Sequence, residues 1–161
     1  MWRTAQTGLW GFCVIVLVLL MSRPVAAVTP VTTKFYSVTL PDDWIVLKGP
    51  VRGKDNVLLQ MADTTHSTTA TLVVGKIAKG ETDQLVQMYS KRLQSQPNKQ
   101  KHQTEFFLLH GQERGYCIVR EDPSAHLLLI LTVSGKLPKA DFLFSLRTPY
   151  KALVPERPHL P

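Results

Sequence analysis

The sequence predicts an α+β domain, built on an antiparallel sheet of about six to seven strands with flanking helices. Three observations indicate this class. Short segments such as 35–40 alternate apolar and polar side chains with the period of two that a half-buried strand requires. Turn-forming residues separate these segments at short intervals. Over residues 83–95, by contrast, the apolar side chains recur with the period of a helix.

The stretch 35–44 carries the sharpest local signals. Residues 35–40 form the first expected strand, and Pro41 ends it because proline cannot donate a ladder hydrogen bond. The two aspartates that follow suit a turn. Trp44 then begins a second strand, 44–47, whose apolar side chains require a core.

Two more strands are expected before the helix. Gly49 and Pro50 are predicted to break the chain after the second strand. Strands then follow at 56–62 and 70–77, and the second of these is rich in β-branched residues. The polar residues 63–69 form the loop that joins them.

One amphipathic helix is expected over 83–95. Thr82 is predicted to cap its N-terminus, while Lys91 and Arg92 lie near its C-terminus, where cations interact favourably with the helix dipole. Pro97 then stops the helix. The side chains predicted to form its apolar stripe are Leu85, Met88, Tyr89 and Leu93.

The second half of the chain is predicted to be mostly strands. They lie at 105–110, 115–121 and 126–134, and the last is apolar enough to be central and buried on both faces. Residues 139–147 are interpreted as a short helix, with a strand as the competing interpretation. Residues 149–161 contain three prolines beyond Pro149 and form an extended tail that cannot join a central strand.

The opening Phe-Tyr-Ser-Val-Thr-Leu-Pro-Asp-Asp-Trp44 and the closing Phe-Ser-Leu-Arg147 frame this order of elements. The pattern resembles the PsbP-like α/β/α sandwich families, which include many uncharacterised bacterial exported proteins, over roughly residues 33–148. The resemblance implies a central antiparallel sheet with helices on both sides. It implies no shared activity, because this fold hosts unrelated binding roles.

The N-terminal residues have the features of a cleavable signal peptide. Arg3 precedes an apolar run at 9–21, and Val25 and Ala27 suit the cleavage positions. We therefore expect a signal peptide over 1–27, which would place the protein in the periplasm or outside the cell. An uncleaved membrane anchor is the alternative, but the apolar run is shorter than the ~20 residues that a spanning helix needs.

Removal of this signal leaves a chain of single-domain size, with one α+β domain at 28–148 and the proline-rich tail at 149–161. It also leaves Cys117 as the only cysteine, so no intramolecular disulfide is expected. Cys117 alternates with Tyr116 and Ile118 in a predicted strand, which is typical of a small core residue. The histidines near it in sequence do not by themselves indicate a nucleophile.

Two groups of residues are candidates for binding. Asp63 and His66 lie in a loop rich in hydroxyl groups, which suits an anion, a sugar or, with partners from elsewhere, a metal. An exposed loop that bonds its own backbone is the simpler interpretation. The second group is a basic cluster, suited to phosphate or anionic lipid, although a solvated helix end is the simpler interpretation here too. Its members are Lys91, Arg92, Lys99, Lys101 and His102.

The sequence contains no recognisable catalytic, metal-binding or phosphate-loop motif. We therefore expect an exported, non-enzymatic binding or accessory domain that acts on a protein partner in the cell envelope, without a cofactor, a metal or nucleic acid. One alternative is a protein associated with the membrane surface, which would use the basic cluster for weak contact with anionic lipid. Another is a hydrolase whose site is assembled in space. The oligomeric state stays open.

Overall fold

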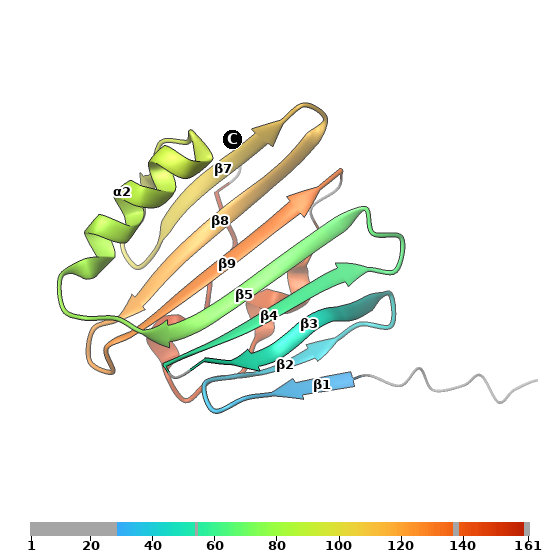
Figure 1. Ribbon diagram of the computed structural model, residues 1–161, viewed down its shortest axis with the longest axis horizontal. Coiled ribbons are helices and arrows are strands. Elements are labelled where there is room, and N and C mark those ends of the chain that lie inside the picture. Colours follow the sequence, from blue (N-terminus) through green and yellow to red (C-terminus); the bar gives the residue numbers. More distant parts are fainter. Residues whose placement is uncertain (1–28, 54, 137–138, 160–161) are drawn as a thin grey trace, which may run out of the picture.

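The computed structural model describes residues 29–53, 55–136 and 139–159. The predicted signal peptide, its cleavage positions and Pro138 lie outside the described residues. The described chain forms a seven-stranded sheet in the order β3-β4-β5-β9-β8-β7-β6 and a separate two-stranded sheet, β1-β2 (Figure 1). All the strand pairs are antiparallel.

Along the chain, strands come before and after a single α-helix in the described residues. They are β1 (Thr29–Thr32), β2 (Ser37–Leu40), β3 (Trp44–Arg52), β4 (Asn56–Asp63), β5 (Thr68–Lys76), α2 (Glu81–Leu93), β6 (Asn98–Lys99), β7 (Thr104–His110), β8 (Glu113–Asp122), β9 (Leu127–Gly135) and the 3₁₀ helices η1 (Asp141–Ser145) and η2 (Lys151–Leu153).

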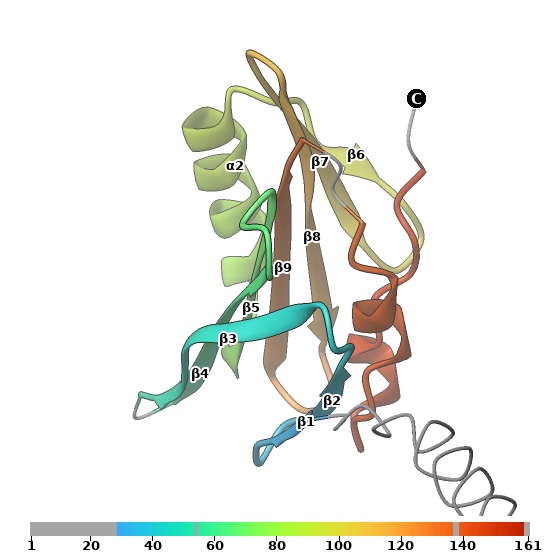
Figure 2. The ribbon, with the colours of Figure 1, turned by 90° about the vertical axis from the view of Figure 1, so that its right-hand side faces the viewer.

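The large sheet is covered differently on its two faces. Figure 2 shows α2 on one face, with β1, β2, η1 and η2 on the other. This arrangement confirms the antiparallel sheet and the α+β class in outline. Within the described residues, however, one α-helix flanks the sheet, and the helices of the second face are single 3₁₀ turns.

Each face of the sheet has its own hydrophobic core. The first core contains the buried residues of the opening stretch, and Trp44 packs edge-on against Phe142 with ring centroids 4.9 Å apart. The second core lies under α2 and includes Val86, Phe106 and Cys117. As predicted, the strand following residue 126 is central: β9 is the fourth of the seven strands, and residues 127–131 are buried.

The two ends of the pattern that resembles PsbP-like proteins meet in space. Ser37 and Arg147 exchange two backbone hydrogen bonds, of 2.8 and 2.9 Å. The Thr148 hydroxyl donates to the carbonyl oxygen of Phe35 at 2.8 Å. The segment before Arg147 is helical rather than extended, because η1 buries Leu143 against the first core.

The predicted break at Gly49 and Pro50 is wrong, because β3 continues to Arg52. The strand passes this point with irregular pairing between Lys48 and Val51 instead of ending. Gly49 has φ = 99°, and a β-carbon there would lie 2.4 Å from the carbonyl oxygen of Leu58. Only glycine therefore allows the two strands to stay so close.

The helix also differs in two details. It begins at Glu81, with Gly80 and not Thr82 at the cap position, and the Thr82 hydroxyl donates to Glu121 at 2.6 Å. Val86 is its most buried residue, whereas Met88 is 52 % exposed and does not face the core as predicted. Two residues correspond to roughly 200° around a helix, so these side chains lie on nearly opposite sides.

Two short strands were not expected. β1 pairs with β2, and β6 pairs with β7, at two places where the sequence analysis assigned no strand. Segments of two to four residues are too short to show a period in their side chains.

Candidate functional site

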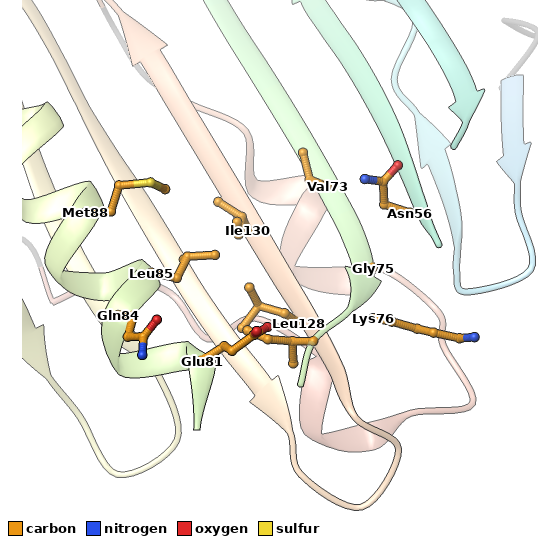
Figure 3. Close-up of a pocket in the computed structure, with 11 residues that line it drawn as sticks. Asn56, Val73, Gly75, Lys76, Glu81, Gln84, Leu85, Met88, Leu128 and Ile130 are labelled. Carbon is orange, nitrogen blue, oxygen red and sulfur yellow. The ribbon is translucent and has the colours of Figure 1, made fainter. Parts of the chain in front are cut away.

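A groove runs beside α2 on the face of the sheet that this helix only partly covers. It has a volume of about 550 Å³, and its floor comes from β5 and β9 while α2 forms one wall (Figure 3). Its apolar lining consists of Val73, Ile77, Leu85, Met88, Leu128 and Ile130. Polar side chains at its edge are Asn56, Lys76, Glu81 and Gln84.

Strand pairing explains why the floor is apolar. Val73 of β5 lies opposite Ile130 of β9, and both side chains point to the side of α2 because paired residues share a face. Gly75 closes the end of the groove, and a β-carbon there would lie 2.7 Å from the β-carbon of Asn56. The missing side chain at position 75 therefore leaves room for Asn56 at the edge.

The floor of the groove extends away from α2 as an apolar row across the sheet. Val51, Leu58, Val73 and Ile130 are paired in sequence from β3 to β9, so the four side chains lie side by side on one face. Ile130 is buried near the helix, and Val51 at the outer strand is 45 % exposed. We call Val51, Leu58 and Val73 the apolar row.

A hydrogen-bonding row lies next to it. The same pairing places Lys48, Gln60, Thr71 and Thr132 side by side. In β4, β5 and β9 each member is two positions from the residue of the first row, and the direction reverses in β5 because the strands are antiparallel. In Figure 1 α2 lies over the side of the sheet that contains β7, and in the described part of the chain it leaves β5, β4 and β3 uncovered on this face. The uncovered half therefore offers apolar and hydrogen-bonding side chains in adjacent rows.

The charged groups at the edge of the groove already have partners. Lys76 forms an ion pair with Asp55, with 3.3 Å between the ammonium nitrogen and the carboxylate oxygen. The Glu81 carboxylate accepts a hydrogen bond of 3.1 Å from the backbone of Ala78. Since the floor is uncharged, the groove is suited to holding an apolar group and not to acid–base chemistry.

A second pocket, of about 570 Å³, lies at the start of α2. Its walls come from the first turns of α2, the β6–β7 connection, the end of β8 and η2. The basic residues that line it are Lys99, Lys101, His102, Arg120 and Lys151. We call this the cationic pocket.

The structure divides the basic cluster that the sequence suggested. Lys91 and Arg92 lie in the last turn of α2, and Arg92 lines a different pocket. Lys99 pairs at 3.2 Å with Asp83 in the first turn, and Lys99 and Lys101 both line the cationic pocket. The division arises because the chain reverses after α2, and β6 pairs with β7 near the start of the helix.

The loop that contains Asp63 and His66 bonds largely to itself. The Asp63 carboxylate accepts hydrogen bonds from the Ser67 hydroxyl at 2.6 Å, the Ser67 backbone at 2.8 Å and the Thr65 hydroxyl at 3.1 Å. These bonds, that of the Ser67 side chain first, lower the pKa of Asp63. His66 is exposed, in the left-handed region with φ = 54°, and its backbone N–H donates to the Asp63 carbonyl.

Cys117 lies in the core beneath α2, as its alternation with Tyr116 and Ile118 predicts. Burial raises the pKa of its thiol to about 11, so the thiol stays protonated at neutral pH and is a poor nucleophile. Across the described ranges, no three His, Cys, Asp or Glu side chains are placed to hold a metal ion.

Sequence reasoning missed a buried polar cluster beneath the C-terminal segment, residues 151–159. Glu105 is fully buried and accepts hydrogen bonds from the Gln103 amide at 2.6 Å and the His159 backbone at 3.2 Å. The Gln103 side-chain amide also donates to the Glu156 carbonyl and accepts from the Glu156 backbone N–H. The sequence did contain one signal of this cluster: Glu105, a charged residue, occupies a position in the strand 104–110 at which a core residue is expected.

Arg120 of β8 holds the same segment. It is 6 % exposed, and it donates to the Ala152 carbonyl at 2.8 Å and to the Glu156 carboxylate at 3.0 Å. Together with buried Leu153, these contacts attach the C-terminal segment to the sheet.

The fold and the groove define a class, an α+β domain with a half-covered antiparallel sheet. No protein-family model matches the chain, and no curated protein matches it significantly. In the part of the chain that the structure describes, no helix has both the length and the apolar character to cross a membrane.

Proposed function

We propose that this chain is an exported, non-enzymatic binding domain that acts on a protein partner in the cell envelope. The N-terminal pattern of residues 1–27 supports export to the periplasm or beyond. The buried, protonated Cys117 and the self-bonded Asp63 favour binding over catalysis.

One observation carries this proposal: the apolar row lies on an uncovered half-face and continues into the groove. A helix is about 10 Å wide and strands are spaced by about 4.8 Å, so one helix covers roughly two strands. α2 therefore leaves room on β3, β4 and β5 for a polypeptide segment of similar width. Apolar side chains beside hydrogen-bonding ones are typical of protein–protein interfaces.

We also propose that the domain is a PsbP-like sandwich. The order of its strands around one helix supports this, as does the contact between the opening stretch and the segment ending at Arg147. The thin second layer, made of β1, β2, η1 and η2, departs from the two helical layers that the resemblance implies. An experimental structure of the chain, superposed on PsbP-like domains, tests this assignment through the order and direction of the strands.

Photo-crosslinking in the native cell tests the partner. The full-length chain carries p-benzoylphenylalanine in place of Thr71, which lies in the hydrogen-bonding row on the uncovered half-face. We expect one discrete crosslinked protein band. The same probe at Gln112, an exposed residue in the β7–β8 turn, is the matched control and is expected to yield no band.

The substitution Val51→Asp completes the test, because Val51 is 45 % exposed and its replacement leaves the core intact. A charge in the apolar row is expected to abolish the Thr71 adduct. An adduct that persists in Val51→Asp, an equal adduct from Gln112, or no adduct from Thr71 would each rule out a partner on this surface.

A further inference from the structure

We propose that the cationic pocket binds a phosphate-type oxyanion. The site is separate from the groove, and the inference does not depend on the proposed function. It rests on cations that three segments bring together: Lys99 and Lys101 precede β7, Arg120 lies in β8, and Lys151 begins η2. The first turns of α2 close the pocket.

The carboxylates around the pocket are already engaged. Asp83 pairs with Lys99 at 3.2 Å, and Glu121 accepts the Thr82 hydroxyl at 2.6 Å. Glu156, which does not line the pocket, pairs with Arg120 at 3.0 Å. Among the described residues, Lys101 and Lys151 have no ion-pair partner. Two lysine ammonium groups from distant segments therefore remain available to an anion.

Arg120 gives the pocket a fixed base. Only 6 % of Arg120 is exposed, and two of its nitrogen atoms donate to Ala152 and Glu156. It therefore holds a positive charge in place, partly neutralised by Glu156, while the exposed lysines that line the same pocket can adjust to a ligand. A rigid guanidinium combined with mobile ammonium groups is a common arrangement for binding phosphate.

The pocket also offers neutral hydrogen-bonding groups and sufficient space. Thr104 and Gln100 line it beside the lysines and can donate to oxyanion oxygens. A volume of about 570 Å³ exceeds what one phosphate ion needs, so the pocket can hold a phosphoryl group together with the organic part that carries it. The shared chemistry is a phosphoryl oxyanion, from a free metabolite or a lipid headgroup.

Calorimetric titration of the purified protein with inorganic phosphate tests the site. We expect saturable binding that weakens as sodium chloride is added, because salt screens charge interactions at exposed lysines. The double variant Lys101→Ala/Lys151→Ala is expected to bind phosphate roughly tenfold or more weakly, since it loses two charge-assisted contacts. Both side chains are exposed, and a thermal unfolding curve confirms that the variant is folded.

The matched control is Lys91→Ala/Arg92→Ala, which removes the same charge from the other end of α2. It is expected to bind phosphate as the unmodified protein does. Sedimentation with phosphatidylglycerol vesicles, using the same variants, distinguishes a lipid headgroup from a soluble ligand. Loss of vesicle binding or of phosphate binding in Lys101→Ala/Lys151→Ala alone supports the site. If the protein bound neither phosphate nor the vesicles, or if both double variants lost binding equally, the proposal would be overturned.

Discussion

At the scale of single residues, two aspartates show how short polar contacts hold the turns of this protein. Asp122 ends β8, where its carboxylate accepts hydrogen bonds from the Ser124 hydroxyl at 2.5 Å and from the backbone N–H groups of Ser124 and Ala125. Asp63 plays the same role at the end of β4. In both cases the hydrogen bonds stabilise the ionised carboxylate, the first cause being a serine side chain, and lower its pKa.

This predicts a pH dependence of stability at Asp122. Because its pKa is lower in the folded than in the unfolded protein, its stabilising effect is complete above the ordinary value of 3.8 and is lost as the pH falls through the folded-state value. The unfolding free energy of wild type should therefore exceed that of Asp122→Asn at pH 7, and the difference should shrink below pH 3.8. Urea unfolding at several pH values measures it. A difference that stays constant, or grows in acid, would contradict this explanation.

At the scale of elements, α2 shows that packing decides which side of a helix is buried. Val86 is 3 % exposed, and Leu85, Tyr89 and Leu93 pack partly against the same core. Met88 instead forms the exposed lip of the groove. The sequence-based stripe included Met88 and omitted Val86 because several apolar side chains surround the helix, and their spacing alone allows more than one stripe.

Two substitutions in α2 compare these positions. Val86→Ala is expected to lower the free energy of unfolding by about 2 kcal/mol, because it leaves a cavity in the second core. Met88→Ala, the matched control on the same helix, is expected to change it by less than about 0.5 kcal/mol. Chemical denaturation with urea measures both. Equal losses at the two positions would show that the helix packs on a different side.

At the scale of the whole molecule, the C-terminal segment completes the fold by covering buried charges. Without residues 151–159, Arg120 would lose both of its acceptors, Glu105 would lose its bonds from His159, and both charges would face solvent at the edge of the first core. The proline-rich sequence predicted an extended tail outside the central strands; residues 149–159 do lie outside the strands, but residues 151–153 form the helical turn η2. It did not suggest that the segment packs, because its partners on β7 and β8 are more than thirty residues away in the chain.

A substitution at Glu105 tests this organisation. Glu105→Ala is expected to lower the free energy of unfolding by about 3 kcal/mol, because it removes the carboxylate that accepts the buried 2.6 Å hydrogen bond from Gln103 and the bond from the His159 backbone. Glu113→Ala, an exposed glutamate at the start of β8, is the control and should have little effect. Limited proteolysis should also cut the Glu105→Ala protein sooner after Lys151. If the two variants were equally stable, the buried cluster would not hold the segment.

The two candidate sites could likewise be predicted from the sequence only in part. The sequence contained Lys99 and Lys101 as part of one basic run, but nothing in it placed Lys151 or Arg120 beside them. The groove was not visible at all, because its floor combines Val73 with Ile130, which only strand pairing brings together.

By itself, the sequence predicted the strands 56–62 and 126–134, which correspond to β4 and β9, as well as the helix, the Pro41–Asp43 turn and the interior place of Cys117. Each of these depends on the spacing of apolar side chains or on turn residues that are neighbours in the chain. Only the tertiary structure decided the half-covered face, the grouping of the lysines and the attachment of the C-terminal segment. These depend on contacts between residues far apart in the chain, such as Glu105 and His159 at a separation of 54 positions, whose energies no local pattern records.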